Sequence, residues 1–283
     1  MRLQEEDVQQ GGSAELSVFA DAGVLTKARG FFVKTLAIAE LEARKLRHDF
    51  PELLTRAVQP VLWLLLFGGV LSRARIIQTG GLPYLDFMAP GILGQSALFV
   101  SIFYGVGLLW ERDLGITNKL LVSPTPRSAL VLGKALSAGV RALSQAVIIY
   151  AVALLLGVRL NWNPLALMGV LFAVVLGAAL FATFSLIIAC LVKTRERFMG
   201  IGQLLTMPLF FASNAIYPLS LMPDWLRVIS RVNPLSYEVD ALRALMLQNG
   251  VSTFGLPTDY AVLLVSSAAL VLVGAYLYPR VIL

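Results

Sequence analysis

Few residues of this chain have the type and spacing that catalysis needs. The stretch SALVLGKA, residues 128–135, comes nearest to a phosphate-binding loop, but Ser128 replaces its first glycine and Ala135 its final Ser/Thr. One histidine, His48, and one cysteine, Cys190, offer neither a Cys/His zinc cluster nor an intrachain disulfide. His48 also lies far in sequence from the serines of the apolar segments, which argues against a Ser–His nucleophile. We therefore expect no catalytic residue, no cofactor and no metal on this chain.

A polar stretch between two apolar segments indicates mechanical rather than catalytic chemistry. It reads WERDLGITNKLLVSPTPRSALVLGK, residues 110–134. Gly115 permits a sharp break, and Pro124 stops the chain after about two helical turns. The sequence predicts a short helix here, whose Leu120 and Leu121 could insert into a groove on another protein. A solvated loop that merely joins two helices would explain the same residues.

The composition requires a bilayer around the elements that hold this stretch. The 283 residues are 58% hydrophobic and 14% charged, with a mean hydropathy of +0.78. Soluble chains average roughly 45–50% apolar and about 25% charged residues. So much apolar sequence indicates an integral membrane protein. The net charge of +6 comes from Lys and Arg concentrated beside apolar segments, where they set topology, so we expect no nucleic-acid partner.

Six segments are apolar enough to be predicted as membrane-spanning helices, each needing roughly 20 residues. They cover residues 57–77, 84–110, 129–157, 165–192, 198–217 and 260–278. No acidic residue lies well inside any of them, and Asp86 stands only at the edge of the second, which argues against ion-coupled transport. We therefore expect an all-α membrane protein with six spans.

The distribution of Lys and Arg predicts the topology and three regions of the chain. The cationic residues favour one side, which places both termini and residues 110–134 in the cytoplasm of a multi-pass protein of the plasma (inner) membrane. Residues 1–30 are predicted to be a flexible cytoplasmic tail, 31–56 an amphipathic connecting helix, and 57–283 the six-helix domain. The connecting helix could equally be a topological anchor. Residues 220–259 predict short amphipathic or re-entrant helices at the outer membrane edge.

Three stretches resemble the permeases of ABC type-2 transporters, the membrane subunits of ATP-binding-cassette exporters. They are ERDLGITNKLLVSPTPRSALVLGKAL, MPLFFASNAIYPLSLMPDWLRVISRVNPLSYEVDALRALML and RAVQPVLWLLLFGGVL. The resemblance extends from about residue 31 to the C-terminus. Within the family, the chain looks most similar to the daunorubicin-resistance and nodulation-factor exporters. The chain departs from the family where Ile116, Thr117, Asn118 and Lys119 follow the glycine.

The resemblance implies partners and sites. It implies two cytoplasmic ATPase subunits, which would carry ATP and magnesium, and a second permease chain, identical or a sister, in a membrane of lipids. The implied ATPase contact is a coupling helix containing Glu111, Gly115, Leu120, Leu121 and Pro124. Asn233, Pro234 and Leu235 match the family's outer re-entrant Asn-Pro-Leu segment.

The family also lines a cavity between protomers with its second and fifth spans. The residues that match this cavity are Gln95, Phe99, Gln203, Thr206, Phe210 and Asn214. Hydrogen bonding between helices is an alternative role for the same polar side chains.

Together these features predict a non-enzymatic permease subunit of an ATP-driven exporter. Its cargo would be amphipathic drugs or lipid-linked compounds. A non-transporting membrane scaffold or assembly subunit is the alternative, and a secondary transporter ranks third.

Overall fold

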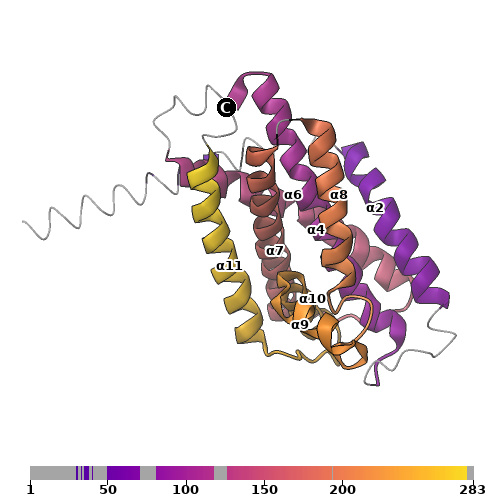
Figure 1. Ribbon diagram of the computed structural model, residues 1–283. Coiled ribbons are helices and arrows are strands. Elements are labelled where there is room, and N and C mark those ends of the chain that lie inside the picture. The colour runs from indigo at the N-terminus through magenta and orange to yellow at the C-terminus, as the bar shows by residue number, and fades with distance from the viewer. Residues whose placement is uncertain are drawn as a thin grey trace, which may run out of the picture.

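The computed structural model describes residues 50–70, 81–117, 126–192 and 194–278, together with positions 30, 33, 35–37 and 40. The elements form a helical bundle, and no strand occurs in the described residues (Figure 1). In chain order they are α2 (Phe50–Trp63), the π-helical η1 (Leu64–Gly68), α4 (Tyr84–Asp113), α6 (Arg127–Leu155), α7 (Pro164–Leu191), α8 (Arg195–Phe211), the 3₁₀ turn η2 (Leu219–Leu221), α9 (Asp224–Val232), α10 (Pro234–Met246) and α11 (Leu256–Leu277).

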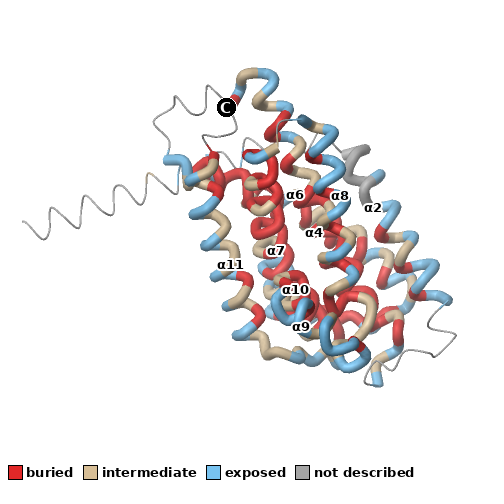
Figure 2. The backbone as a smooth tube through the Cα atoms, in the orientation of Figure 1, coloured by how far each residue is buried: buried red, intermediate tan, exposed pale blue. Residues whose placement is uncertain are grey.

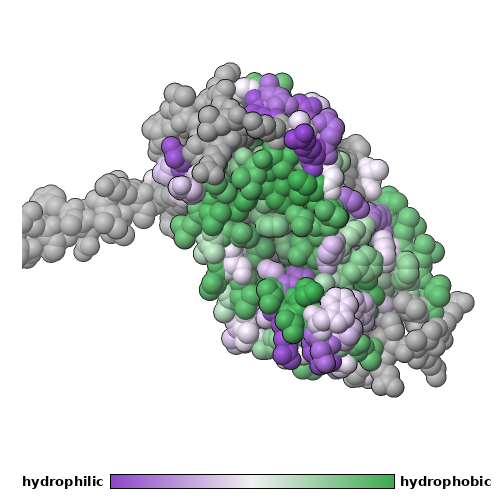
Figure 3. All heavy atoms as spheres, viewed as in Figure 1, coloured by the Kyte–Doolittle hydropathy of each residue, from purple (hydrophilic) through white to green (hydrophobic). Residues whose placement is uncertain are grey.

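Four of these helices, α4, α6, α7 and α11, are long and apolar enough to cross a membrane. A broad hydrophobic area crosses the visible face of the molecule, and hydrophilic residues gather toward its ends (Figure 3). Both observations agree with an integral membrane protein. Two further predicted spans correspond to shorter elements. One is the apolar helix Val58–Gly68, which consists of the end of α2 together with η1, and the other is the 17-residue α8.

Helix α4 runs antiparallel to α6 and α8, so the bundle has two distinct ends. The N-terminus of α4 lies with the C-termini of α6 and α8, at what we name the Tyr84 end. The C-terminus of α4 lies with the N-termini of α6 and α8, at the Asp113 end. The short helices α9 and α10 lie at the Tyr84 end, at the opposite end of the bundle from the last turn of α11 (Figure 1).

Several observed helix ends differ from the predicted span ends, and α2 and α8 are examples. Helix α2 is described from Phe50 onward, so helical structure is continuous across residue 57, where the first span was predicted to begin. Helix α8 ends at Phe211, six residues before the predicted end at Tyr217. It stops there because side chains bind its last carbonyl groups: Ser213 Oγ donates to Phe210 O at 2.7 Å, and Tyr217 Oη donates to Phe211 O.

Two Asn-Pro-Leu triplets begin helices in the same way. Asn163 Oδ1 accepts a hydrogen bond from Leu165 N at 2.9 Å before α7, and Asn233 Oδ1 accepts one from Leu235 N at 3.0 Å before α10. Each asparagine satisfies a backbone N–H that the helix itself leaves unpaired. The proline that follows occupies the first helical position, where no N–H is needed.

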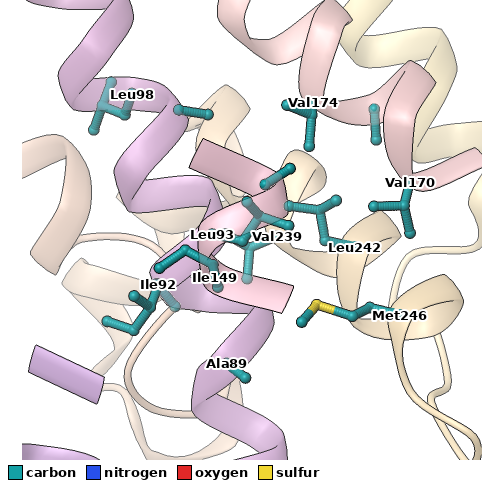
Figure 4. Close-up of a cluster of buried hydrophobic side chains, with 14 of the residues drawn as sticks. Ala89, Ile92, Leu93, Leu98, Ile149, Val170, Val174, Val239, Leu242 and Met246 are labelled. Carbon is teal, nitrogen blue, oxygen red and sulfur yellow. The ribbon is translucent and has the colours of Figure 1, made fainter. Parts of the chain in front are cut away.

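The core forms where α10 packs between α4 and α7. Val239, Leu242 and Met246 of α10 meet Ile92 of α4 and Val174 of α7 in one buried cluster (Figure 4). Helix α4 is the central element, with 72% of its most apolar window buried, whereas only 11% of the corresponding window of α11 is buried (Figure 2). The exposed apolar side chains of α11 are those expected to face lipid.

Candidate functional site

The end of α4 is joined to α6 by a largely buried ion pair. Lys134 Nζ donates to Glu111 Oε2 at 2.5 Å, and the Lys134 side chain is only 4% exposed. Such a charge is stable away from water only when it is paired and hydrogen-bonded. The pair therefore fixes the orientation of the last turn of α4 relative to the first turns of α6.

A second set of contacts joins the same turn of α4 to the start of α8. Asp113 accepts a hydrogen bond from Arg195, and the Arg195 guanidinium carbon lies 3.5 Å from the centre of the Trp110 ring. Arg112 also donates to Asp113, from Nε and Nη2 at 3.1 Å each. We name Trp110, Glu111 and Asp113 of α4, with Lys134 and Arg195, the α4 clamp. It links three helices at the point where α4 ends.

A polar seam continues from the α4 clamp along the α4–α6 interface. The hydroxyls of Tyr104 and Ser137 are 2.7 Å apart, and Arg141 lies 5.7 Å from the Tyr104 ring centre. Further along, Ser96 Oγ donates to Gln145 Oε1 at 3.4 Å. Hydrogen bonds between helices in an apolar environment resist sliding of one helix past the other. The seam is therefore a continuous connection from the α4 clamp to the middle of the bundle.

Gly115 is placed as the sequence predicts, at a sharp break directly after α4. Its φ of +71° is a conformation that glycine adopts readily, and its N–H donates to Arg112 O at 2.9 Å. Ile116 and Thr117 are helical after the break. Leu120, Leu121 and Pro124 of the predicted coupling helix lie outside the described residues, as do most of residues 1–49.

The predicted outer segment forms a second junction, at the Tyr84 end. Besides capping α10, Asn233 donates from Nδ2 to Leu209 O at 2.6 Å and to Ala212 O at 3.3 Å. Leu235 is fully buried and Pro234 is half-buried. One side chain thus ties the beginning of α10 to the end of α8. Helices α9 and α10 are the short helices that the sequence predicts between the last two spans.

Buried charges near α10 were missed by the sequence analysis. Glu238 is fully buried, neither carboxyl oxygen has a partner in the described residues, and burial raises its pKa well above the ordinary value. Burial lowers the pKa of Arg243 to about 10, opposed by Asp240. Asp240 Oδ2 accepts hydrogen bonds from the backbone N–H groups of residues 253 and 254. The only sequence signal for these buried charges is the i,i+3 spacing of Asp240 and Arg243, which places them on one helical face. Exposed ion pairs have the same spacing, so it does not indicate burial.

The six residues proposed for a cargo cavity occupy different environments. Gln95, Thr206, Phe210 and Asn214 are buried, Phe99 is half-buried and Gln203 is exposed. Thr206 Oγ1 donates to Gly202 O in its own helix, and Phe210 packs edge-on to Trp63 at 6.0 Å. Asn214 lies beyond the end of α8. A cavity between protomers needs a second chain, so this set remains a prediction.

Comparison with known proteins identifies the family. The profile described as ABC-2 type transporter matches residues 33–247. The chain belongs to the ABC-2 type transporter family. The resemblance inferred from the three sequence stretches is thereby confirmed. The Asp113 and Tyr84 ends are therefore the two ends of a transport permease.

Individual relatives of this ABC-2 chain are also named as permeases. It is 33% identical over 197 residues to a protein of Cyanophora paradoxa named as the transport permease ycf38, covering 68% of this chain and 67% of that one. It is 26% identical to the daunorubicin resistance ABC transporter permease protein DrrB1 of Streptomyces coeruleorubidus, covering 83% and 80%. It is 24% identical to the inner membrane transport permease YadH of Escherichia coli K12, covering 87% and 95%. A role in transport across a membrane follows from this family.

Proposed function

We propose that this chain is the membrane subunit of an ATP-driven exporter of amphipathic drugs or lipid-linked compounds. An ATP-binding-cassette subunit would supply ATP hydrolysis and magnesium, and two copies would bind two permease chains, most simply a homodimer in the plasma (inner) membrane. The family and the daunorubicin-resistance name of one relative support an exporter. Both termini and residues 110–126 would be cytoplasmic, because Lys and Arg are more frequent in the segments on that side of the predicted spans.

The α4 clamp is the observation that carries this proposal. A partner that pushes on residues 114–126 moves the end of α4, and the ion pairs of Glu111 and Asp113 pass that movement to α6 and α8. Because separating a buried ion pair is energetically costly, such a pair acts as a rigid connection rather than a hinge. ATP-driven closure of the partner subunits would thus tilt three helices together and switch a cavity between two protomers from inward- to outward-facing.

The mechanism separates two roles that variants can distinguish. Leu121→Asp places a charge in the predicted docking helix, so we expect the ATPase subunit to be lost when the tagged chain is purified. The double variant Glu111→Gln with Lys134→Met removes the α4 clamp pair without leaving either charge alone. Because the Glu111 side chain is only 12% exposed and pairs with Lys134 of the same chain, this variant should retain the bound ATPase but lose stimulation of ATP hydrolysis by cargo.

The matched control is Arg231→Gln on α9, an exposed residue at the opposite end of the bundle. It should keep both the bound ATPase and its stimulation. If no ATPase associates with a folded, abundant wild-type chain, the exporter proposal is wrong and a scaffold role replaces it. If the double variant remains fully coupled, the α4 clamp is not the connection.

A further inference from the structure

A pocket of about 510 Å³ opens at the Tyr84 end, far from the α4 clamp. It lies where the start of α4, the α6–α7 connection, the turn after α8, and α10 with the loop that follows it converge. Its lining includes Arg159, Arg243, Asn214, Phe87, Leu219 and Val251. Helix α4 has 30 residues, so the pocket is roughly 45 Å along the bundle from Asp113.

The charged side chains that line the pocket are both arginines. Arg159 is 58% exposed, whereas Arg243 is 6% exposed and its guanidinium carbon lies 3.8 Å from the centre of the Phe87 ring. Their acidic partners lie behind them: Asp86 is 3.5 Å from Arg159, Asp240 is 4.0 Å from Arg243, and neither carboxylate lines the pocket. The pocket therefore presents cations toward its interior and keeps its anions outside.

Asn214 adds a buried polar group that has no protein partner. The residue is 1% exposed, and neither the oxygen nor the nitrogen of its side-chain amide is hydrogen-bonded within the described residues. Its backbone carbonyl accepts a hydrogen bond from Arg243 Nη2 at 2.7 Å, which orients the guanidinium. Because the side-chain amide atoms of Asn214 are themselves fully buried, the contribution of this residue to the pocket is to hold Arg243 in place through its backbone carbonyl.

We propose that this pocket binds a phosphate group. Arginine side chains suit phosphate oxygens because the planar guanidinium donates two parallel hydrogen bonds. Phe87, Leu219 and Val251 also line the pocket, and their apolar surface suits the acyl chains that adjoin the phosphate of a lipid. The ligand is either the phosphate of an anionic lipid or free phosphate. The proposal does not depend on ATP-driven export.

The test is a thermal unfolding titration of the full chain purified in a mild detergent. One arm adds inorganic phosphate, with sodium chloride at equal ionic strength as the reference. The other adds dihexanoyl-phosphatidylglycerol, with dihexanoyl-phosphatidylcholine as the reference. A ligand that binds only the folded chain raises the unfolding midpoint with its concentration. Arg159→Gln should weaken this binding about tenfold, as expected for a lost hydrogen bond to a charged group.

Arg231→Gln is the matched control, because Arg231 is an exposed arginine at the same end that does not line the pocket. It should respond as wild type does. Stabilisation by phosphatidylglycerol beyond that by phosphate assigns the ligand to a lipid headgroup, and equal stabilisation assigns it to free phosphate. The proposal is overturned if neither ligand raises the wild-type midpoint above its reference. It is equally overturned if folded Arg159→Gln responds as wild type does.

Discussion

Lys134 of α6 and Glu111 of α4 form an ion pair, Nζ to Oε2 at 2.5 Å, in a position where the lysine is almost wholly buried. Twenty-three residues separate them in the chain, and the predicted coupling segment lies between them. The ion pair closes this segment into a loop with a fixed base. A force applied to the loop is therefore delivered to two helices at once.

Removing one member of this pair should destabilise the chain more than removing both. Lys134→Met leaves Glu111 charged and largely buried, with an expected cost of about 3–5 kcal/mol. The double variant Glu111→Gln with Lys134→Met should recover much of that loss. Denaturant unfolding of the two single variants, the double variant and wild type completes the cycle. Additive losses from the single variants would show that the two side chains do not interact.

Substitution of Gly115 should destabilise the chain because of the backbone conformation at this residue, not because space is lacking. A Cβ placed there meets no atom of the described residues within 4 Å, but the φ of +71° is unfavourable for other residues. Gly115→Ala should therefore lower the free energy of unfolding by about 1–2 kcal/mol. Gly107 within α4 is equally open and has helical backbone, so Gly107→Ala is the control and should be neutral or slightly stabilising. Equal losses in both variants would mean that φ does not decide the difference.

The two Asn-Pro-Leu triplets allow the roles of Asn233 to be separated. Asn163→Ala should cost about 1 kcal/mol, because Asn163 Oδ1 only caps α7. Asn233→Ala should cost more, since it also removes the donor to Leu209 O and Ala212 O, a loss of about 1–3 kcal/mol for buried acceptors. Asn233→Ser should fall between these values, because serine can cap α10 but cannot reach both carbonyls. Midpoints of chemical unfolding measure all three, and equal losses at both asparagines would contradict the junction.

Glu238 should make the stability of the chain depend on pH. Burial holds its pKa in the folded state above the unfolded value of about 4.3, so the folded chain keeps a proton that the unfolded chain has released. The stability it contributes is present below that unfolded value and is lost as pH rises toward the folded pKa. Glu238→Gln removes the titrating group, so its unfolding midpoint relative to wild type should rise with pH.

Glu196→Gln on α8 is the control for this series, because Glu196 is exposed. Its midpoint relative to wild type should not show the rise with pH that Glu238→Gln shows. A flat difference for Glu238→Gln would mean that Glu238 is ionised in the folded chain and has a partner that compensates its charge.

The sequence by itself determined the membrane class, the family and the positions of several breaks. Composition and long apolar segments indicated spanning helices, and those features depend only on local hydropathy. Gly115 and Asn233 stand where the motifs predict, since a positive φ and a helix cap are set by residues a few positions apart. The early end of α8 was not predictable, because its last carbonyl groups are bound partly by Asn233, over twenty residues away.

The tertiary structure alone decided which charges meet. Lys134 and Arg195 look like ordinary topological cations in the sequence, yet the antiparallel order of α4, α6 and α8 brings both to the last turn of α4. Burial likewise distinguishes Glu238 from the exposed Glu196, and convergence of four segments creates the pocket around Asn214. Hydropathy is a property of each residue and can be read from the sequence. Ion pairs, burial and cavities instead depend on contacts between segments that only the packing of the chain brings together.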